Sequence, residues 1–260
     1  MFNPAGVCSI LISYLSFTKF SQILKGKSSF IPVPAKYAGP TRYKWSNVVG
    51  SFVHAIIMAS LGCYCFYTTP EYLEDRLTTC TTLGEVITGI FVGYLIFDSV
   101  DLLKYQGFYA TWPVLVHHIL LSCVGIGYFL YHHSFIGYVI LACFAEINSI
   151  FLHGRMLLLM YGTPKTSLLF KVNNAINIFS FLTCRLGSFT VLMLMLHDDC
   201  NATSSLWCCG INLCSLILFG ISVVLLYRVL RSDFLSRRSD TNVDDDDVLS
   251  NNNANSTKSQ

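Results

Sequence analysis

The stretch that decides the fold is residues 134–160, which read SFIGYVILACFAEINSIFLHGRMLLLM. About 20 apolar residues cross a bilayer as a helix, and this run is longer than that. It nevertheless contains Glu146, and a second long apolar run contains Arg185. Because an ionisable group at the centre of the hydrocarbon costs about 3 kcal/mol or more, such residues usually mark a polar site between helices. The sequence therefore predicts membrane-spanning helices that enclose a polar site.

The composition supports a chain whose main solvent is lipid. It is 53% hydrophobic and only 12% charged, with a mean hydropathy of +0.54. A net charge of +2 gives no reason to expect a nucleic-acid partner. Most of the eleven cysteines lie in apolar runs, without zinc-finger or CxxC spacing. The sequence thus predicts neither a metal site nor a bound cofactor.

Apolar runs predict the fold class as an all-α, multi-pass transmembrane helical bundle with six to seven spans. The first run is short, which leaves the count open, and polar residues interrupt the fifth and sixth. The expected spans lie near residues 3–18, 47–67, 84–104, 112–131, 134–160, 168–196 and 206–228.

Charge placement predicts the orientation of these spans. The connection from Lys19 to Lys44 carries basic residues and no acidic one, so it is expected in the cytosol. Seven spans then put the N-terminus outside, whereas six would put it in the cytosol. On the outer side we expect a glycosylation sequon at Asn201 and, as one pairing to test, a disulfide between Cys80 and Cys200.

The same features divide the chain into three parts. Residues 1–43 hold the first span and the basic cytosolic loop, and residues 44–231 hold the main transmembrane domain. Residues 232–260 include the acidic run Asp244–Asp247 and many asparagines, without an apolar pattern that could form a core. We therefore expect a disordered cytosolic tail.

The third span carries a polar stripe. Tyr94, Asp98, Asp101 and Tyr105 recur at steps of four, three and four, which places them on one helical face. Asp98 lies roughly 9 Å inside the cytosolic boundary at 1.5 Å per residue. The pair Gly89–Gly93 should let another helix approach closely. Asp101 is open to a second interpretation, as part of a wetted helix end.

The fourth span contains His117 and His118, at nearly the depth of Asp98 if the two helices are antiparallel neighbours. A neutral imidazole near carboxylates can act as a general base. Adjacent helical residues point about 100° apart, so the two rings must have different roles. The alternative is a pair of interfacial histidines bonded to backbone or water.

The fifth and sixth spans complete the candidate site. Glu146, Ser149 and His153 share one face of the fifth span. Arg185 lies near mid-membrane in the sixth and should have a carboxylate partner, with Glu146 the first candidate and Asp98 the second. Such a pair could equally be structural, fixing how the helices pack. The predicted polar cavity is lined by His117, His118, Asp98, Glu146, Ser149 and Arg185.

The order of these residues resembles the TLC domain, which is shared by translocation-associated membrane proteins and Lag1-type ceramide synthases. The resemblance covers residues 44 to about 230 and is greatest to the small TLC domain-containing proteins. Its motifs are Lys44-Trp45, His54, Gly93-Tyr94-Leu95 with Asp98, His117-His118, Glu146-x-x-Ser149-x-Phe151 with Arg155, and Arg185.

The resemblance implies two functions. Ceramide synthases acylate a sphingoid amine from acyl-CoA, with paired histidines and, one span later, two aspartates three residues apart. His117 and His118 match the histidines, but Glu146 and Ser149 stand in the segment of the aspartates. We therefore expect a lipid-handling protein that acts on membrane lipid composition. An acyl-CoA-dependent N-acyltransferase, with catalytic candidates among His117, His118, Asp98 and Glu146, is the alternative.

Other readings of the same topology are a seven-helix receptor and a transport or protein-translocation role. The receptor is disfavoured because the third span lacks Asp-Arg-Tyr and the seventh lacks Asn-Pro-x-x-Tyr. The resemblance implies the endoplasmic reticulum membrane rather than the plasma membrane. The expected partners are membrane lipids, with a sphingolipid or a phospholipid class both open, as is the oligomeric state.

Overall fold

A computed structural model of the chain describes residues 4–26, 29–130, 136–200 and 205–235. Every regular element in these residues is a helix, which confirms the predicted all-α class. Within the same residues, seven helical segments are long and apolar enough to cross a membrane. The chain divides into two compact units, Met1–Phe219 and Gly220–Gln260. Of the second, the described residues form the end of the last long helix and a short π-helix.

Five of the seven spans are each built on one α-helix and two are interrupted. The fifth span is two helices joined by a tight turn, and the sixth contains a π-helical segment. The elements are α1 (Pro4–Lys25), α2 (Arg42–Thr68), α3 (Thr82–Tyr105), α4 (Phe108–Leu130), α5 (Ile136–Ala142), α6 (Ala145–Met160), α7 (Leu168–Ser180), η3 (Phe181–Leu186), α8 (Gly187–Asp199) and α9 (Ser205–Leu230), with the short η1 (Ala35–Tyr37), η2 (Pro70–Leu73) and η5 (Arg231–Leu235).

The first span is longer than hydropathy predicted. The expected limit near residue 18 is wrong, because α1 continues to Lys25. The added turns place Lys25 in an ion pair with Asp101 of α3, at the end of α1. Helical hydrogen bonding continues past the apolar stretch there, since the side chains of the added turns have partners on a neighbouring helix.

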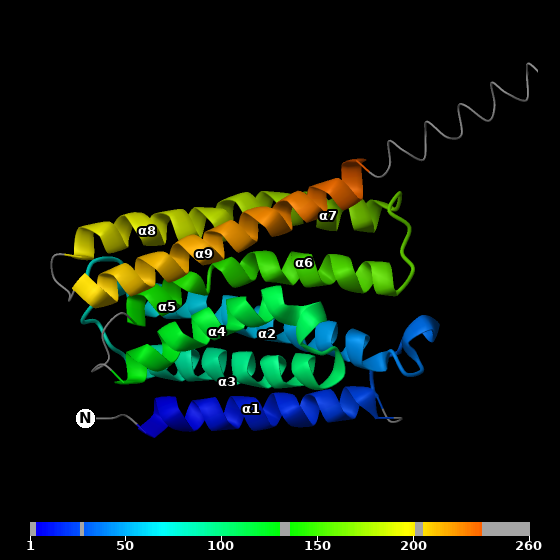
Figure 1. Ribbon diagram of the computed structural model, residues 1–260, viewed down its shortest axis with the longest axis horizontal. Coiled ribbons are helices and arrows are strands. Elements are labelled where there is room, and N and C mark those ends of the chain that lie inside the picture. Colours follow the sequence, from blue (N-terminus) through cyan, green and yellow to red (C-terminus); the bar gives the residue numbers. More distant parts are fainter. Residues whose placement is uncertain (1–3, 27–28, 131–135, 201–204, 236–260) are drawn as a thin grey trace, which may run out of the picture. The chain divides into compact units, whose positions relative to one another are not determined.

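Successive spans of the first unit run in alternating directions (Figure 1). This brings the basic connection between α1 and α2 to the same end as the connections from α3 to α4 and from α6 to α7. That grouping agrees with the side predicted for the cytosol. Helix α3 is the most buried span: 67% of the residues in its most apolar stretch are buried, against 28% for α1.

Helix α1 packs closely along α3, and the two lie side by side in Figure 1. The glycines that sequence analysis identified face α1: a Cβ on Gly89 would lie 2.7 Å from that of Ser9, and one on Gly93 would lie 2.8 Å from that of Ser13. The Ser13 hydroxyl also donates to the carbonyl of Ile90 over 2.8 Å. The prediction that Gly89 and Gly93 admit a close helix is confirmed, with α1 as the neighbour.

A clasp of polar side chains fastens the opposite end of the first unit. The Arg76 guanidinium donates to both carboxylate oxygens of Asp199 at 3.0 and 3.1 Å, and the Tyr138 hydroxyl donates to the same carboxylate. The hydrogen bond to Asp199 raises the pKa of Arg76 further above its ordinary value. The clasp ties the loop before α3 to α5 and α8.

The proposed pairing of Cys80 with Cys200 is wrong, because Cys200 is joined to Cys208. The two cysteines lie at the end of α8 and in the first turns of α9, so short separation along the chain favours their pairing over the more distant Cys80. Asn201, the proposed glycosylation site, lies outside the described residues, and so do residues 236–260 of the predicted tail.

The interruptions in the fifth and sixth spans position the two charged residues that the sequence singled out. After the turn between α5 and α6, Glu146 falls in the first turn of α6. A helix N-terminus favours a negative charge there. Arg185 lies within η3, where the helix widens by one residue per turn. Such π-helical segments in longer helices are frequently found at functional sites.

We predict that Gly93→Leu destabilises the bundle, because the larger side chain would collide with α1. Overpacking of this kind costs roughly 1–3 kcal/mol of unfolding free energy. Denaturant titration of the purified protein in mixed micelles would measure this loss. Gly210→Leu in α9 is the matched control, since a Cβ at Gly210 meets nothing within 4 Å. Equal stability of the two variants would contradict the packing.

Candidate functional site

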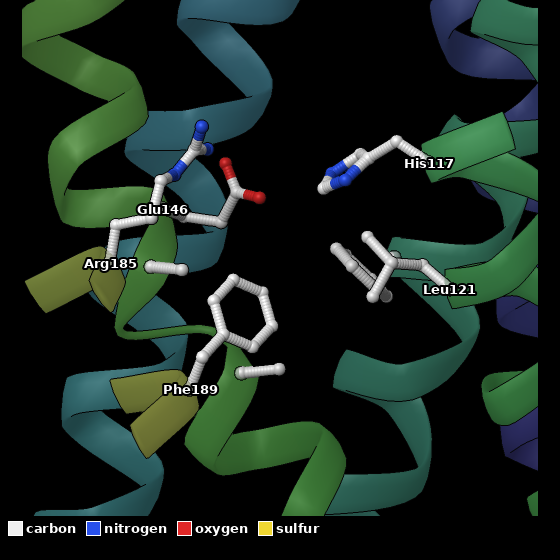
Figure 2. A pocket seen from close by; sticks show the side chains of 8 residues that line it. His117, Leu121, Glu146, Arg185 and Phe189 are labelled. Atoms are coloured by element: carbon white, nitrogen blue, oxygen red, sulfur yellow. The ribbon is translucent and has the colours of Figure 1, made fainter. Parts of the chain in front are cut away.

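A pocket within the first unit gathers residues from six elements. Its polar side chains are His117, Glu146 and Arg185. Figure 2 shows His117 across the space from Glu146 and Arg185, all three in the upper part of the view, with Leu121 and Phe189 below them. It has about 10 Å³ of room for the centre of a water molecule, roughly enough for one water. The lining residues are Phe91, His117, Leu121, Ala142, Ala145, Glu146, Arg185 and Phe189.

Arg185 is the most buried charge in this pocket, with 8% of its surface exposed. One guanidinium nitrogen, Nη2, donates to the hydroxyl of Ser149 over 2.8 Å. Another, Nε, is buried without a hydrogen-bond partner among the described residues. The guanidinium carbon lies 5.5 Å from the centre of the Phe181 ring. Arg185 is therefore held in place on one side and still has a donor to offer.

Arg185 does not form the direct ion pair that the sequence predicted. Within the described residues no carboxylate oxygen lies within 4.0 Å of its guanidinium, and its bonded partner is Ser149 instead. Glu146 lines the same pocket and interacts with Arg185 through its charge. Because Ser149 is one turn along α6 from Glu146, it holds the guanidinium beside the carboxylate without direct contact.

The two histidines of α4 face different surroundings, as their adjacency predicted. Their ring centres lie 5.8 Å apart. His117 is half-buried and lines the pocket, whereas His118 is buried against α3. There, its Nδ1 lies 3.6 Å from a carboxylate oxygen of Asp98 and 3.4 Å from the Ser99 hydroxyl. His117 is thus placed to contact a ligand in the pocket, and His118 is placed to be oriented by Asp98.

Behind His118, a ladder of polar contacts joins α2 to α3. Asn47 donates to Asp98 over 2.6 Å, and the Tyr94 hydroxyl donates to Ser51 over 2.9 Å. The ring of His54 stacks on that of Tyr94, with centres 3.7 Å apart. The three α2 residues share one helical face, as do their partners on α3. These contacts fix the orientation of Asp98 toward α4.

Sequence reasoning did not include Asn47 or Ser51 in the site. Asn47, Ser51 and His54 recur at steps of four and three residues. This was a usable signal, because it gives α2 a polar stripe like that of Asp98 and Tyr94 on α3. Nothing in the sequence showed that the two stripes face each other. Asp101, by contrast, pairs with Lys25 near the end of α3 and does not line the pocket.

A separate cluster of amides and hydroxyls holds α6 to α7. The side-chain nitrogen of Asn148 donates to the backbone carbonyl and to the side-chain oxygen of Asn177, both at 3.0 Å, and to the Ser180 hydroxyl at 3.2 Å. On the next turn, Asn173 donates to the carbonyl of Phe151. Buried networks of this kind fix helix packing. They set the position of η3, and hence of Arg185.

The predicted site residues therefore form two connected groups. His117, Glu146 and Arg185 share the pocket, with Ser149 behind Arg185. Asp98 and His118 form a second group between α3 and α4. Since His117 and His118 are consecutive, α4 links the groups. The structure thus brings three of the six proposed cavity residues into one pocket. Ser149 bonds Arg185, His118 is next to His117 in the chain, and Asp98 is linked to the pocket only through His118.

Comparison with known proteins identifies the frame in which this site is built. The family model of the TLC domain matches residues 44–231, which is more than half of the chain. The chain belongs to the TLC domain family. The predicted resemblance is confirmed, and the site lies wholly inside the TLC domain. With its apolar helices, membership makes this an integral membrane protein.

Among curated proteins, the chain is similar to small members of the family. TLC domain-containing protein 2 of Danio rerio is 29% identical over 230 residues, covering 87% of this chain and 91% of that protein. TLC domain-containing protein 1 of Rattus norvegicus is 29% identical over 226 residues, covering 84% and 88%. TLC domain-containing protein 4 A of Dictyostelium discoideum is 27% identical over 149 residues, covering 56% of each.

We predict that Asn47 and Asp98 are energetically coupled, because a buried hydrogen bond links them inside the TLC domain. A double-mutant cycle with Asn47→Leu and Asp98→Leu should give a coupling of about 0.5–3 kcal/mol in unfolding free energy. The control cycle pairs Asn47→Leu with Asp101→Leu, whose carboxylate binds Lys25 instead. If both cycles gave the same coupling, the assigned contact would be wrong.

Proposed function

We propose that this TLC-domain protein binds membrane lipids in the pocket of His117, Glu146 and Arg185, and that it thereby acts on the lipid composition of its membrane. The observation that carries the proposal is the buried Nε of Arg185, which lacks a partner beside a second charged group. An unsatisfied buried donor costs about 1–3 kcal/mol, and more for a charged group. A polar group brought in by a lipid would satisfy it.

The location of the pocket supports a lipid as guest. Its helices are spans long and apolar enough to cross a bilayer, and its apolar lining includes Leu121, Phe91 and Phe189. With a small polar group of a lipid beside Arg185, the acyl chains would stay outside the pocket, on the apolar surface of the helices. His117, which lines the polar end of the pocket, is half-buried. We also propose the endoplasmic reticulum membrane as the location of the protein, because the family resemblance implies it.

Lipidomic comparison of cells with and without the protein tests this proposal. We predict a broad shift in phospholipid species when the protein is lost, restored by the wild-type chain and not by Arg185→Met or His117→Ala. His197→Ala is the matched control, because His197 is exposed near the outer end of α8, away from the pocket. An unchanged lipid profile, or full restoration by Arg185→Met at equal protein level, would contradict the proposal.

A second candidate is acyl transfer from acyl-CoA to a lipid amine, and it is favoured by the contact of His118 with Asp98. In this reaction a histidine would accept the amine proton as the nitrogen attacks the thioester carbonyl. A C–N bond forms, the C–S bond breaks, and the thiolate of coenzyme A leaves and takes up a proton. Against it stands the segment of Glu146 and Ser149, where ceramide synthases have two aspartates.

Labelled acyl-CoA and a sphingoid base, incubated with the purified protein, distinguish the two candidates. The binding function predicts no N-acyl product above a protein-free blank. If product forms and falls by about a hundredfold or more in His118→Ala, as removal of a general base should cause, the enzyme replaces the first proposal. Asp98→Asn should then lower turnover as well, whereas Asp101→Asn should leave it intact.

A further inference from the structure

The pocket that binds lipid under the proposed function is small enough to restrict what it can take. Its room for about one water matches a single hydroxyl group. A phosphodiester headgroup, with its phosphorus and four oxygens, is several times larger. In this conformation the polar end therefore fits the smallest of the lipid headgroups.

The charges of the pocket favour an uncharged lipid. When both side chains are ionised, Arg185 and Glu146 carry opposite charges that interact, so an uncharged ligand leaves these charges balanced. A charged guest would add an unbalanced charge inside a low-dielectric region, which is unfavourable unless the new charge is itself paired. Ser149 already uses Nη2 of the guanidinium, which reduces what is left to pair an anion.

The hydrogen-bonding capacity of Arg185 and Glu146 determines which polar group of a lipid fits between them. The Nε of Arg185 can only donate, and the Glu146 carboxylate, which faces the same space in Figure 2, can only accept when ionised. A hydroxyl does both at once, because its oxygen accepts and its proton is donated. An ester carbonyl would satisfy Arg185 alone, and a quaternary ammonium would satisfy neither.

We infer that the pocket takes the free hydroxyl group of an uncharged lipid. The hydroxyl lies between Arg185 and Glu146, and the rest of the lipid, with its acyl chains, stays outside the pocket on the apolar surface of the bundle. This inference rests on the proposed function and specifies its ligand class. The half-buried ring of His117 lies at the same polar end and borders the hydroxyl.

Competition against a photoactivatable diacylglycerol tests the inference. The full chain is placed in phosphatidylcholine nanodiscs and crosslinked to the probe, with three competitors of identical oleoyl chains. These are 1,2-dioleoylglycerol, the same molecule with its hydroxyl acetylated, and dioleoyl phosphatidic acid. We expect only the free alcohol to compete well, with the other two about tenfold weaker or more. Equal competition by the acetylated lipid or by phosphatidic acid would overturn the inference.

A variant that removes the charge of Glu146 tests the role of its carboxylate. Glu146→Gln keeps the shape of the side chain and removes the ionised acceptor for the lipid hydroxyl. Because the pocket is no larger in this variant, phosphatidic acid should still compete poorly, and competition by 1,2-dioleoylglycerol should weaken by about tenfold. Glu85→Gln is the control, because Glu85 is a buried carboxylate at the start of α3 and does not line the pocket.

The two levels of the argument fail differently. If the probe labels the chain equally well in Arg185→Met and in wild type, the pocket is not a lipid site and the proposed function fails with the inference. If labelling depends on Arg185 and yet phosphatidic acid competes as well as diacylglycerol, lipid binding stands and the uncharged class is wrong. Unfolding midpoints of each variant, measured in the same nanodiscs, separate lost binding from lost folding.

Discussion

The structure depends on one constraint: within a bilayer, a polar or charged side chain must find its partner inside the protein. Asp98, His118, Glu146 and Arg185 all lie in segments apolar enough to span the membrane. Each faces another helix, and their contacts with Asn47 and Ser149 hold the helices in register. Because lipid surrounds the bundle, the outer surfaces of α1, α4 and α7 carry exposed apolar side chains.

Breaks in helical regularity give the pocket its polar end. A continuous fifth span would bury Glu146 in mid-helix, but the turn after α5 places it in the first turn of α6, where the helix N-terminus favours its charge. The π-helical η3 changes the direction in which Arg185 points, and Ser149 holds its guanidinium. The amide cluster of Asn148 and Asn177 keeps η3 against α6. These interruptions cost some helix stability and give two opposite charges one shared space.

Several parts of the site could be predicted because they follow from spacing along one helix. The divergence of His117 and His118 is one such case, and the stripe of Tyr94 and Asp98 is another. The predicted charge partner of Arg185, Glu146, shares its pocket, but the guanidinium is hydrogen-bonded to Ser149 instead, because similar depth does not determine which side chain lies within bonding distance. The predicted partner of Cys200 was wrong for a related reason. Lying on the same side of a membrane does not determine which cysteine is close enough to bond.

The sequence by itself determined that this is an all-helical membrane protein with a TLC domain, because apolar length and motif order are properties of the chain alone. Only the tertiary structure decided that α1 packs on Gly89 and Gly93, that Asn47 orients Asp98, and that Arg185 bonds Ser149 with one donor left over. Helical periodicity states which residues share a face. Which faces meet depends on the packing of all the helices together, because close packing lets one helix fit only where its neighbours leave space.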